Sequence, residues 1–492
     1  MRLLVPPPCP SNDRRRGAAL MLAMMVMIVL ILIVFQITLG SATDARVAKN
    51  DTQLANFDAA IESALHKALQ DLADDGETED AGAGAGGIAG GLGGGLGPGE
   101  GGETGPVDSR RDTWAMPQQT SINEVQLRVL VQDENSKYNV LTMLTENEEE
   151  AEKAYNRVVR ILDACREGTL HDIDSTQARD MAEGMRTMLR QRRDTVLPKP
   201  VLLTDLQEEP DLGMPMSLSE FVVLPGFEEF HFRDFYDAEG SAVHSIGSFL
   251  TVWTSLKRYS DYVQDLQDEG GVGSTPVVDD PGVATTNEDG GLNAGADGSG
   301  LGDIDDALGA GAGGGSEGYA VNINTAPAAV LRGLFDRRDV PWDVIDELVR
   351  YRNEEDEEAT DPDAEPVYDE FGEEVVMLQI FESVQELNDV EGYEYIDPDV
   401  RQDLERFLTV ESSVFSVFVT ARASTARDGE DGFDTTPEAE LERRKRGTDR
   451  LKTVRLIVWR FADEDEVRIV PVEAWEVLDY MPIEVQDYPD TY

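Results

Sequence analysis

The most constraining feature of this sequence is an uninterrupted apolar run at residues 18–39, which follows three arginines at positions 14–16. The run contains no ionisable side chain, and its polar members are Gln36 and Thr38. As a helix, a run of this length crosses the bilayer hydrocarbon core of about 30 Å. Basic residues stay on the cytoplasmic side of such a helix. The sequence therefore predicts a single-pass membrane anchor with a cytoplasmic N-terminus and a large body on the other side.

The basic leader predicts how this anchor is processed. A short basic leader that ends in Gly17, directly before an intact apolar helix, resembles the class III leader of type IV pilins and pseudopilins. In that family a prepilin peptidase cuts before the helix, here between Gly17 and Ala18, and the new terminus is methylated. The residues alone leave an ordinary signal anchor as the alternative.

Leu22 distinguishes this chain from most pilin-like subunits, which carry a glutamate five residues after the cleaved glycine. The missing carboxylate avoids an unpaired charge in the membrane, but it also removes a contact that the family makes with the neighbouring subunit. This loss resembles the K-type minor pseudopilin of type II secretion systems. The resemblance implies a place at the filament tip, with the anchor in the inner membrane and the body in the periplasm.

The charge balance of the chain limits the classes of partner that it can bind. The 492 residues include 42 Lys and Arg against 98 Asp and Glu, which gives a formal net charge of −56. Such a balance disfavours nucleic acid, whose phosphates need basic side chains. It is typical of a solvated acidic surface or of calcium binding by carboxylates. Cys9 would leave with the leader, so the one remaining cysteine, Cys165, predicts a mature chain without an intramolecular disulfide.

Composition shifts and hydrophobic periodicity divide the chain into consecutive segments. The predicted segments are the leader at residues 1–17, the transmembrane helix at 18–40, its amphipathic continuation at 41–75, a glycine-rich linker at 76–112, the first part of a sheet at 113–145, a first helical insert at 146–268, a Gly/Asp-rich linker at 269–318, a second helical insert at 319–409, and the second part of the sheet at 410–480. Alternating apolar residues predict a half-buried strand at 125–131, and further strands are predicted at 415–421, 451–461 and 467–472.

Three stretches resemble the K-type pseudopilin. Residues 131–144 (VQDENSKYNVLTML) and 412–417 (SSVFSV) are similar to two of its stretches. Residues 319–334 (YAVNINTAPAAVLRGL) are similar to its signature, in which the matching positions are Asn322, Asn324, Thr325, Pro327 and Leu331. Within this third stretch, Thr325 is expected to cap a helix and Pro327 to lie in its first turn.

The resemblance implies an α+β fold, with a pilin-like long N-terminal helix on an antiparallel sheet and a large inserted helical, SAM-like domain. It implies a non-catalytic role at the tip of the type II secretion pseudopilus, where the subunit initiates or caps the filament that exports folded proteins. The implied partners are I- and J-type minor pseudopilins, other pseudopilins and the prepilin peptidase.

Two alternatives to this role remain open. Residues 319–352 also resemble the helix-hairpin-helix of DNA-uptake receptors, although the connection at 336–341 lacks the glycine turn of that module. An anchored extracytoplasmic enzyme is the second alternative, although no catalytic motif supports it.

The acidic run at residues 354–374 is the candidate cofactor site. It fits either a solvated loop or a calcium site, because calcium takes oxygen ligands. The candidate ligands are Asp361, Asp363, Asp369 and Glu370. The resemblance also implies bound calcium, without assigning its ligands, and no other cofactor is expected.

Overall fold

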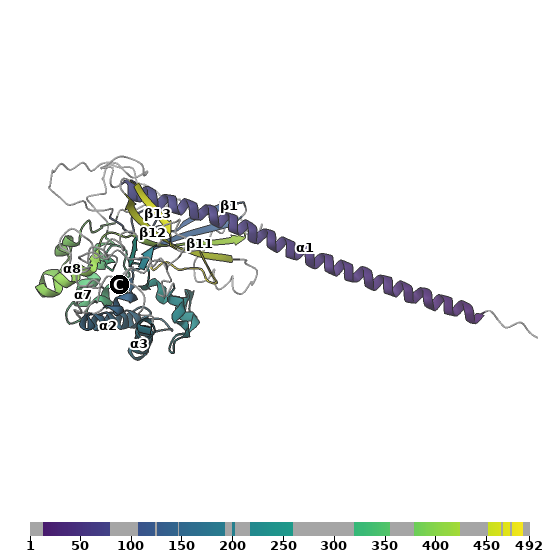
Figure 1. Cartoon of the computed structure of the whole chain (residues 1–492), viewed down its shortest axis with the longest axis horizontal. Helices are drawn as coiled ribbons and strands as arrows, with labels where there is room; N and C mark the ends of the chain where they lie inside the picture. The colour runs from purple at the N-terminus through teal and green to yellow at the C-terminus, as the bar shows by residue number, and fades with distance from the viewer. Residues whose placement is uncertain are drawn as a thin grey trace, which may run out of the picture. The chain divides into compact units, whose positions relative to one another are not determined.

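The computed structural model describes residues 13–78, 107–123, 125–145, 147–191, 199–201, 217–258, 319–354, 378–423, 451–463, 466–472 and 475–485 (Figure 1). The chain divides into two compact units, Met1–Ala60 and Ile61–Tyr492. Several predicted features lie outside the described residues, namely most of the glycine-rich linker, the whole linker at 269–318, and the acidic run with Asp361, Asp363, Asp369 and Glu370.

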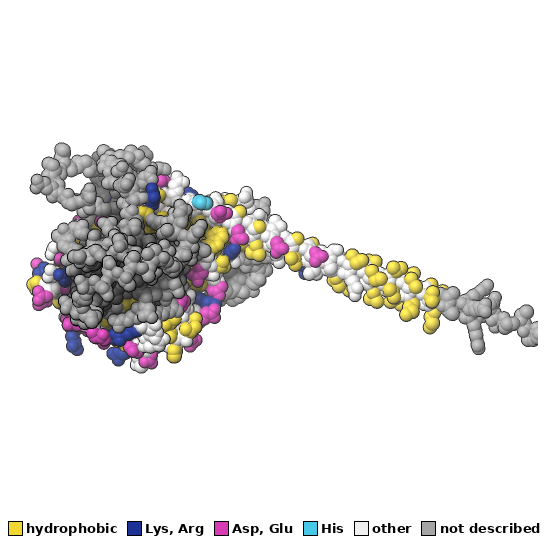
Figure 2. Space-filling view, in the orientation of Figure 1, with side chains coloured by type: hydrophobic (Ala, Val, Ile, Leu, Met, Phe, Trp, Pro, Cys, Tyr) yellow, Lys and Arg dark blue, Asp and Glu magenta, His cyan; other side chains and the backbone are white. Residues whose placement is uncertain are grey.

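A single helix, α1 (Asp13–Thr78), supplies the described part of the first unit. Its large apolar side chains between Leu20 and Leu39 are exposed, and Figure 2 shows them gathered along this stretch. By length and composition, with a mean hydropathy of 3.0 in its most apolar window, the helix is able to cross a membrane. The predicted single long helix is confirmed, and it continues three residues beyond the predicted end at residue 75.

The second unit is built on a six-stranded antiparallel sheet. Its strands are β1 (Gln118–Ile122), β2 (Val125–Asp133), β11 (Val414–Ala423), β12 (Leu451–Asp463), β13 (Glu466–Pro471) and β14 (Glu476–Leu478). The order is β1-β2-β11-β12-β13, and β14 pairs with the first half of β12 while β13 pairs with its second half. The predicted mixed α+β fold is therefore confirmed.

Helix α1 and the helical elements cover the two faces of this sheet. On one face, a Cβ added to Gly76 of α1 would lie 2.9 Å from a methyl group of Val467 on β13. On the other face, Val414 and Trp459 belong to the core that the helical elements form. Because both faces are covered, residues 414–422 of β11 are all buried. The strand therefore consists almost wholly of apolar and small residues.

The prediction of a half-buried strand at residues 125–131 is wrong for β2. Its second face is also buried, with Arg128 at 5% and Leu130 at 2% exposure. Arg128 Nη1 donates to the carbonyl oxygen of Pro482 at 2.8 Å, so the C-terminal segment covers this face. The alternation of polar and apolar residues was misleading because a buried arginine counts as polar in the pattern.

Between β2 and β11 the chain forms what we call the helical body (the described parts of residues 136–411). Its elements are β3 (Tyr138–Asn139), η1 (Val140–Leu144), α2 (Glu148–Ala164), α3 (Ser175–Gln191), β4 (Lys199–Val201), η2 (Leu218–Val223), η3 (Glu229–Phe232), β5 (Phe235–Tyr236), β6 (Ala242–Val243), η4 (Ile246–Ser248), β7 (Leu250–Thr251), β8 (Leu256–Arg258), β9 (Val321–Asn322), α6 (Ala328–Leu334), α7 (Trp342–Tyr351), η5 (Val384–Asp389), η6 (Tyr393–Tyr395), α8 (Pro398–Phe407) and β10 (Leu408–Thr409). The η elements are short 3₁₀ helices of three to six residues.

The first predicted insert is less helical than its sequence suggests. Helices α2 and α3 lie in this insert as predicted, but residues 217–258 form short 3₁₀ helices and short strands. Gly226 and Gly240 adopt positive φ angles of 91° and 87°, which only glycine adopts readily. The hydroxyl of Ser245 accepts from the amide of Gly247 and starts a further turn. These local turns prevent a continuous helix.

The two predicted inserts pack into one core around the contact of α2 with α6. A Cβ on Gly333 of α6 would lie 2.2 Å from Ile161 Cγ1 and 3.1 Å from its amide nitrogen. Arg160 Nε donates to the Gly333 carbonyl at 2.9 Å, and Arg157 Nε donates to that of Leu334 at 3.0 Å. Two arginines of α2 thus satisfy the end carbonyls of α6.

Candidate functional site

The chain leaves the sheet at the end of β2, forms the helical body, and returns to the sheet at the start of β11. We call this connection between the sheet and the helical body the neck (residues 133–135 and 412–414). Its halves continue β2 and β11, which are neighbouring antiparallel strands. Glu134 N donates to the Val414 carbonyl at 2.8 Å and extends the ladder. Asn135 Oδ1 accepts from Val414 N at 3.1 Å, so a side chain takes the place of the next backbone acceptor.

Asp133 lies at the centre of the neck with 4% exposure. Its carboxylate accepts hydrogen bonds from Asn135 N at 2.7 Å, from Ser412 Oγ at 2.6 Å and from Thr325 Oγ1. These donors belong to the outgoing chain, the returning chain and the helical body, respectively. A single buried carboxylate therefore fixes three segments that are far apart in sequence.

Asn322 and Asn324 form the helical body's side of the neck. Asn322 Nδ2 donates to Ser412 Oγ at 2.8 Å and to the Asp108 carbonyl at 3.0 Å. Asn324 binds the backbone of Phe381 in both directions, with its Nδ2 3.0 Å from the carbonyl oxygen and its Oδ1 2.9 Å from the amide nitrogen. Both asparagines are buried, and they pair with backbone groups as a strand neighbour would.

The prediction that Thr325 caps a helix is wrong. The N-cap of α6 is Pro327, which makes no side-chain cap, while the Thr325 hydroxyl is turned to Asp133. A buried carboxylate is a stronger acceptor than a neutral group, which explains why the hydroxyl acts as a donor here. Leu331 is buried in the core of the helical body at 2% exposure.

Glu134 of the neck forms a buried ion pair with Lys137. Their side chains are each 3% exposed, with Nζ 2.6 Å from Oε1. Glu134 also accepts from the hydroxyls of Thr251 and Ser416, which lie on β7 and β11. Burial by itself would raise the pKa of Glu134. The charge of Lys137 and the hydrogen bonds from Lys137 and these hydroxyls outweigh burial, so the pKa of Glu134 is lower than its usual value.

Arg460 on β12 joins the neck to the last turns of α1. Its guanidinium is buried and pairs with the carboxylate of Asp108. The same group donates to the Ser412 carbonyl at 2.9 Å and to Asp75 Oδ2 at 3.2 Å. Trp114 Nε1 also donates to Asp75 Oδ2, at 3.1 Å. Asp75 lies near the end of α1, so this cluster fixes the helix end against the sheet.

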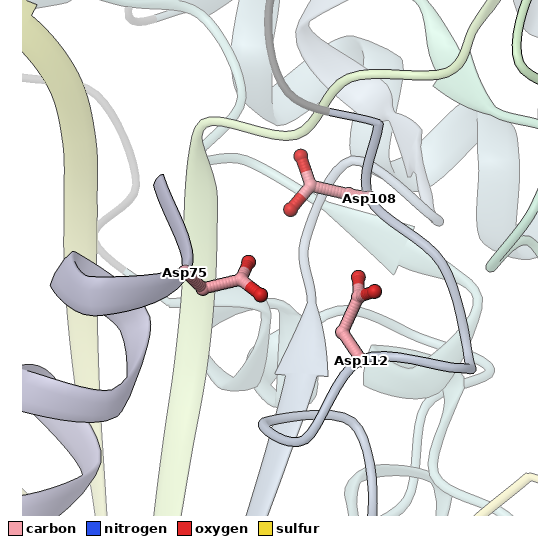
Figure 3. A group of neighbouring side chains, drawn as sticks. All are labelled: Asp75, Asp108 and Asp112. Atoms are coloured by element: carbon pink, nitrogen blue, oxygen red, sulfur yellow. The ribbon is translucent and has the colours of Figure 1, made fainter. Parts of the chain in front are cut away.

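Asp75, Asp108 and Asp112 each place a carboxylate oxygen within 4.8 Å of the others (Figure 3). This donor set does not fit a calcium ion. Arg460 already pairs with two of the carboxylates, and Asp112 accepts from the amide of Ser109 at 2.7 Å. The guanidinium supplies the positive charge that a metal would otherwise bring, so we assign no metal to this group.

We call the connected set Asp75, Arg460, Asp108, Ser412, Asp133 and Thr325 the neck network. Burial raises the pKa of Asp133 to about 6, although the bonds from Ser412 and Thr325 lower it. Burial also raises the pKa of Asp108 against the opposing effect of Arg460, and the charge of Asp133 adds to this rise. Burial lowers the pKa of Arg460, but Asp108 and Asp75 reverse the effect and raise it.

Most predicted positions fall into two groups. Asn322 and Thr325 bind Ser412 and Asp133 at the neck, and Asn324, next to them, binds the backbone of Phe381. Gly17 and Ala18 lie in the first turns of α1, and Leu22 lies further along it with 68% exposure. The candidate calcium ligands lie outside the described residues.

Sequence reasoning missed Asp108 and Arg460. A signal for Arg460 was present, because it stands in a strand that is apolar on both faces. A buried charge at such a position needs a partner, so an acidic residue elsewhere in the chain was to be expected. No local signal identified that partner as Asp108.

Comparisons with known proteins give a structural likeness and no match in sequence. No protein-family model and no curated protein matches the sequence. A solved structure, that of the GspK-GspI-GspJ complex from the type 2 secretion system of enterotoxigenic Escherichia coli, is 11% identical, with 88% of this chain and 99% of that chain covered and a TM-score of 0.40. Neither this identity nor this score establishes a shared family or function.

Proposed function

We propose that the protein is a minor pseudopilin that acts at the tip of a type II secretion pseudopilus. In this proposal α1 anchors the chain in the inner membrane, with its N-terminus cytoplasmic and its body periplasmic, after a prepilin peptidase has removed residues 1–17. The helical body then blocks the addition of a further subunit, so that the protein initiates or caps the filament together with I- and J-type minor pseudopilins. The role is one of assembly and not of catalysis.

The observation that carries this proposal is the convergence of three stretches at the neck. The 131–144, 319–334 and 412–417 stretches each resemble the K-type pseudopilin, and they meet through the bonds of Asp133 with Ser412 and Thr325. Their polar side chains bind one another and backbone groups. This arrangement supports a structural role for the shared residues, which hold an inserted domain on a sheet.

The DNA-receptor alternative receives less support from the α6–α7 hairpin. Arg332 is paired with Asp346, and Arg350 is paired with Glu347. Arg352 is buried and donates to backbone carbonyls of the 319–334 stretch. A phosphate-binding surface needs basic groups that are not already neutralised. Three of the five arginines between residues 319 and 352 are engaged in this way, while Arg337 and Arg338 are exposed, which favours packing as the main role of this hairpin.

Co-purification tests the assembly role. The full-length chain, tagged at its C-terminus, would be expressed with the I- and J-type minor pseudopilins of its own genome and extracted in mild detergent. We expect a stable complex that contains the I- and J-type subunits, and secretion that stops when the chain is deleted. Recovery of the chain alone, with unchanged secretion, would contradict the proposal.

Substitutions at two glycines test whether the leader is cleaved. Gly17→Val should block cleavage by the prepilin peptidase, leave a precursor heavier by the leader, and abolish secretion. Gly40→Ala is the matched control, because a Cβ at Gly40 has no neighbour within 4 Å. The control should be processed and functional.

Calcium binding, which the resemblance implies, stays a prediction for Asp361, Asp363, Asp369 and Glu370. Calorimetric titration of the full-length chain, compared with a variant in which all four residues carry amides, tests it. Equal binding by both proteins would remove these residues as ligands.

A further inference from the structure

The neck network holds more negative than positive charge. Asp75, Asp108 and Asp133 share one guanidinium, that of Arg460, which pairs with the first two. Among the described residues, no Lys or Arg forms an ion pair with Asp133, whose hydrogen-bond donors are two hydroxyls and one amide. Asp133 is therefore a buried carboxylate held by neutral donors alone.

The cations around Asp133 bind other groups and not its carboxylate. The charged groups that surround Asp133 in the neck are Glu134 and Lys137 on its own segment, Asp108 and Arg110 on the preceding loop, Arg460 on β12, Asp75 on α1 and Arg352 directly after α7. Lys137 is paired with Glu134 at 2.6 Å. Arg352 and Arg110 donate to backbone carbonyls of residues 323–326 and not to the carboxylate.

Asp133 and Asp108 are linked through one residue. Ser412 donates its hydroxyl to Asp133 at 2.6 Å and its amide to Asp108 Oδ2 at 2.7 Å. Two buried carboxylates on one short bridge repel each other when both are ionised. A proton on Asp133 relieves this repulsion, and its hydroxyl hydrogen bonds remain available because the Ser412 and Thr325 hydroxyls can act as acceptors.

We propose that the neck is a pH-sensitive latch, which holds the helical body on the sheet more tightly when Asp133 is protonated than when it is ionised. This latch is independent of the proposed role in secretion. An ionised carboxylate is more stable in contact with water than in a buried site. Ionisation of Asp133 therefore favours opening of the neck. Opening would break these hydrogen bonds and loosen the helical body at the ends of β2 and β11, while the antiparallel sheet stays paired.

The sign and size of the effect follow from linkage. The pKa of Asp133 is raised from 3.8 to about 6 in the folded chain. The contribution of protonated Asp133 to the stability of the closed neck is therefore complete below its unfolded pKa of 3.8, and it is lost as the pH rises through about 6. Between about pH 7.5 and about pH 5, the equilibrium constant for opening should fall about tenfold.

Hydrogen–deuterium exchange on the full-length chain in detergent measures this opening directly. The informative peptides contain Asn135, Asn324 and Ser412, whose amides donate within the neck. After correction for the intrinsic pH dependence of exchange, wild-type protection of these peptides should be about tenfold greater at about pH 5 than at about pH 7.5. An unchanged protection would overturn the proposal.

One variant and a control identify the titrating group. Asp133→Asn keeps the shape of the side chain without a titrating proton, so the ratio of protection between the two pH values should fall to about one. Glu183→Gln removes an exposed carboxylate on α3 and should keep the wild-type ratio. An Asp133→Asn protein that keeps the wild-type ratio would show that another group titrates and would exclude the latch.

Thr325→Val keeps the proposal testable if Asp133→Asn does not fold. The substitution removes one donor that favours the ionised carboxylate, so the pKa of Asp133 should rise further. The pH at which the neck tightens should then move upward relative to the wild type. A transition at the wild-type pH, or at a lower one, would contradict the proposal.

Discussion

The Ser412 hydroxyl donates to the Asp133 carboxylate across 2.6 Å, and this contact joins the point where the chain leaves the sheet to the point where it returns. Between these two points lies the helical body, which is connected to two neighbouring strands and whose core includes Val414 and Trp459 of the sheet. An insertion at such a place leaves the strand ladder intact, because β2 and β11 pair as the two arms of a hairpin would. The neck is therefore the place where the orientation of the helical body is determined.

The close approach of α2 and α6 predicts a large effect of one methyl group. Gly333→Ala would place a Cβ 2.2 Å from Ile161 Cγ1 and 3.1 Å from its amide nitrogen, so the helices must separate. We expect a loss of about 1–3 kcal/mol in the free energy of unfolding, the usual cost of overpacking. Gly184→Ala on α3 is the control, since its Cβ would meet only Leu224 at 3.6 Å.

The Gly184 control should be neutral or gain about 1 kcal/mol from helix propensity. Denaturant unfolding of both full-length variants measures the difference. Equal stability of the two variants would mean that α6 does not pack on α2 as described.

Arg460→Met should be strongly destabilising. It leaves Asp108, which has no exposed surface, as a buried carboxylate without its cation. Removal of one partner of a buried pair costs about 3–5 kcal/mol. Arg350→Met removes two ion pairs, with Glu347 and Glu354, of an arginine side chain that is 54% exposed, and it should change stability by less than about 0.5 kcal/mol. Thermal unfolding of both variants distinguishes these outcomes, and a mild effect at Arg460 would argue against the neck network.

Asn324→Ala tests whether the 319–334 stretch has a structural role. The substitution leaves both backbone groups of Phe381 without the partner that the asparagine provides. We expect a loss of about 1–3 kcal/mol in unfolding free energy. Asn388→Ala, at an exposed asparagine that donates to the Gln385 carbonyl, should be nearly neutral. If the two variants unfold alike, Asn324 is not a structural residue.

His231 predicts a pH dependence opposite in sign to that of the neck. Burial lowers the pKa of His231 to about 4, and Arg166 adds to this effect. Its Nδ1 accepts from the Glu228 amide at 2.9 Å, which requires the neutral ring. The unfolded chain binds the proton more readily, so this contribution to stability is lost as the pH falls from about 6.5 towards about 4.

His231→Asn should remove this part of the acid sensitivity, because the asparagine oxygen can accept the same bond. His66→Asn, at an exposed position on α1, should retain the wild-type sensitivity. Unfolding free energies across this pH range measure both, and an unchanged profile for the His231 variant would contradict the assignment.

Periodicity and charge predicted those parts of the fold that depend on local pattern. The uncharged run and the apolar positions that follow it predicted α1, and the apolar strands predicted β2, β11 and β12. The sequence failed where tertiary contacts outweigh local preference. Thr325 binds a buried carboxylate and leaves the helix end uncapped, and residues 217–258 follow their glycine and serine turns and not a helical period.

The neck could be predicted only in part. The three stretches were identified through a resemblance, but their meeting point depends on contacts between residues about 190 to 280 positions apart, which no local pattern encodes. Asp108 follows a glycine-rich tract that gives no structural signal. Arg460 was the detectable member, because a buried cation implies a buried anion.

The N-terminal sequence and intact mass of the protein, purified from its native membrane, test the proposed function most directly. We predict a mature chain that begins at Ala18 with a methylated amine, as processing by a prepilin peptidase requires. A chain that still begins at Met1 would contradict the pseudopilin account. It would make the leader an ordinary signal anchor and return the DNA-receptor and enzyme alternatives to equal standing.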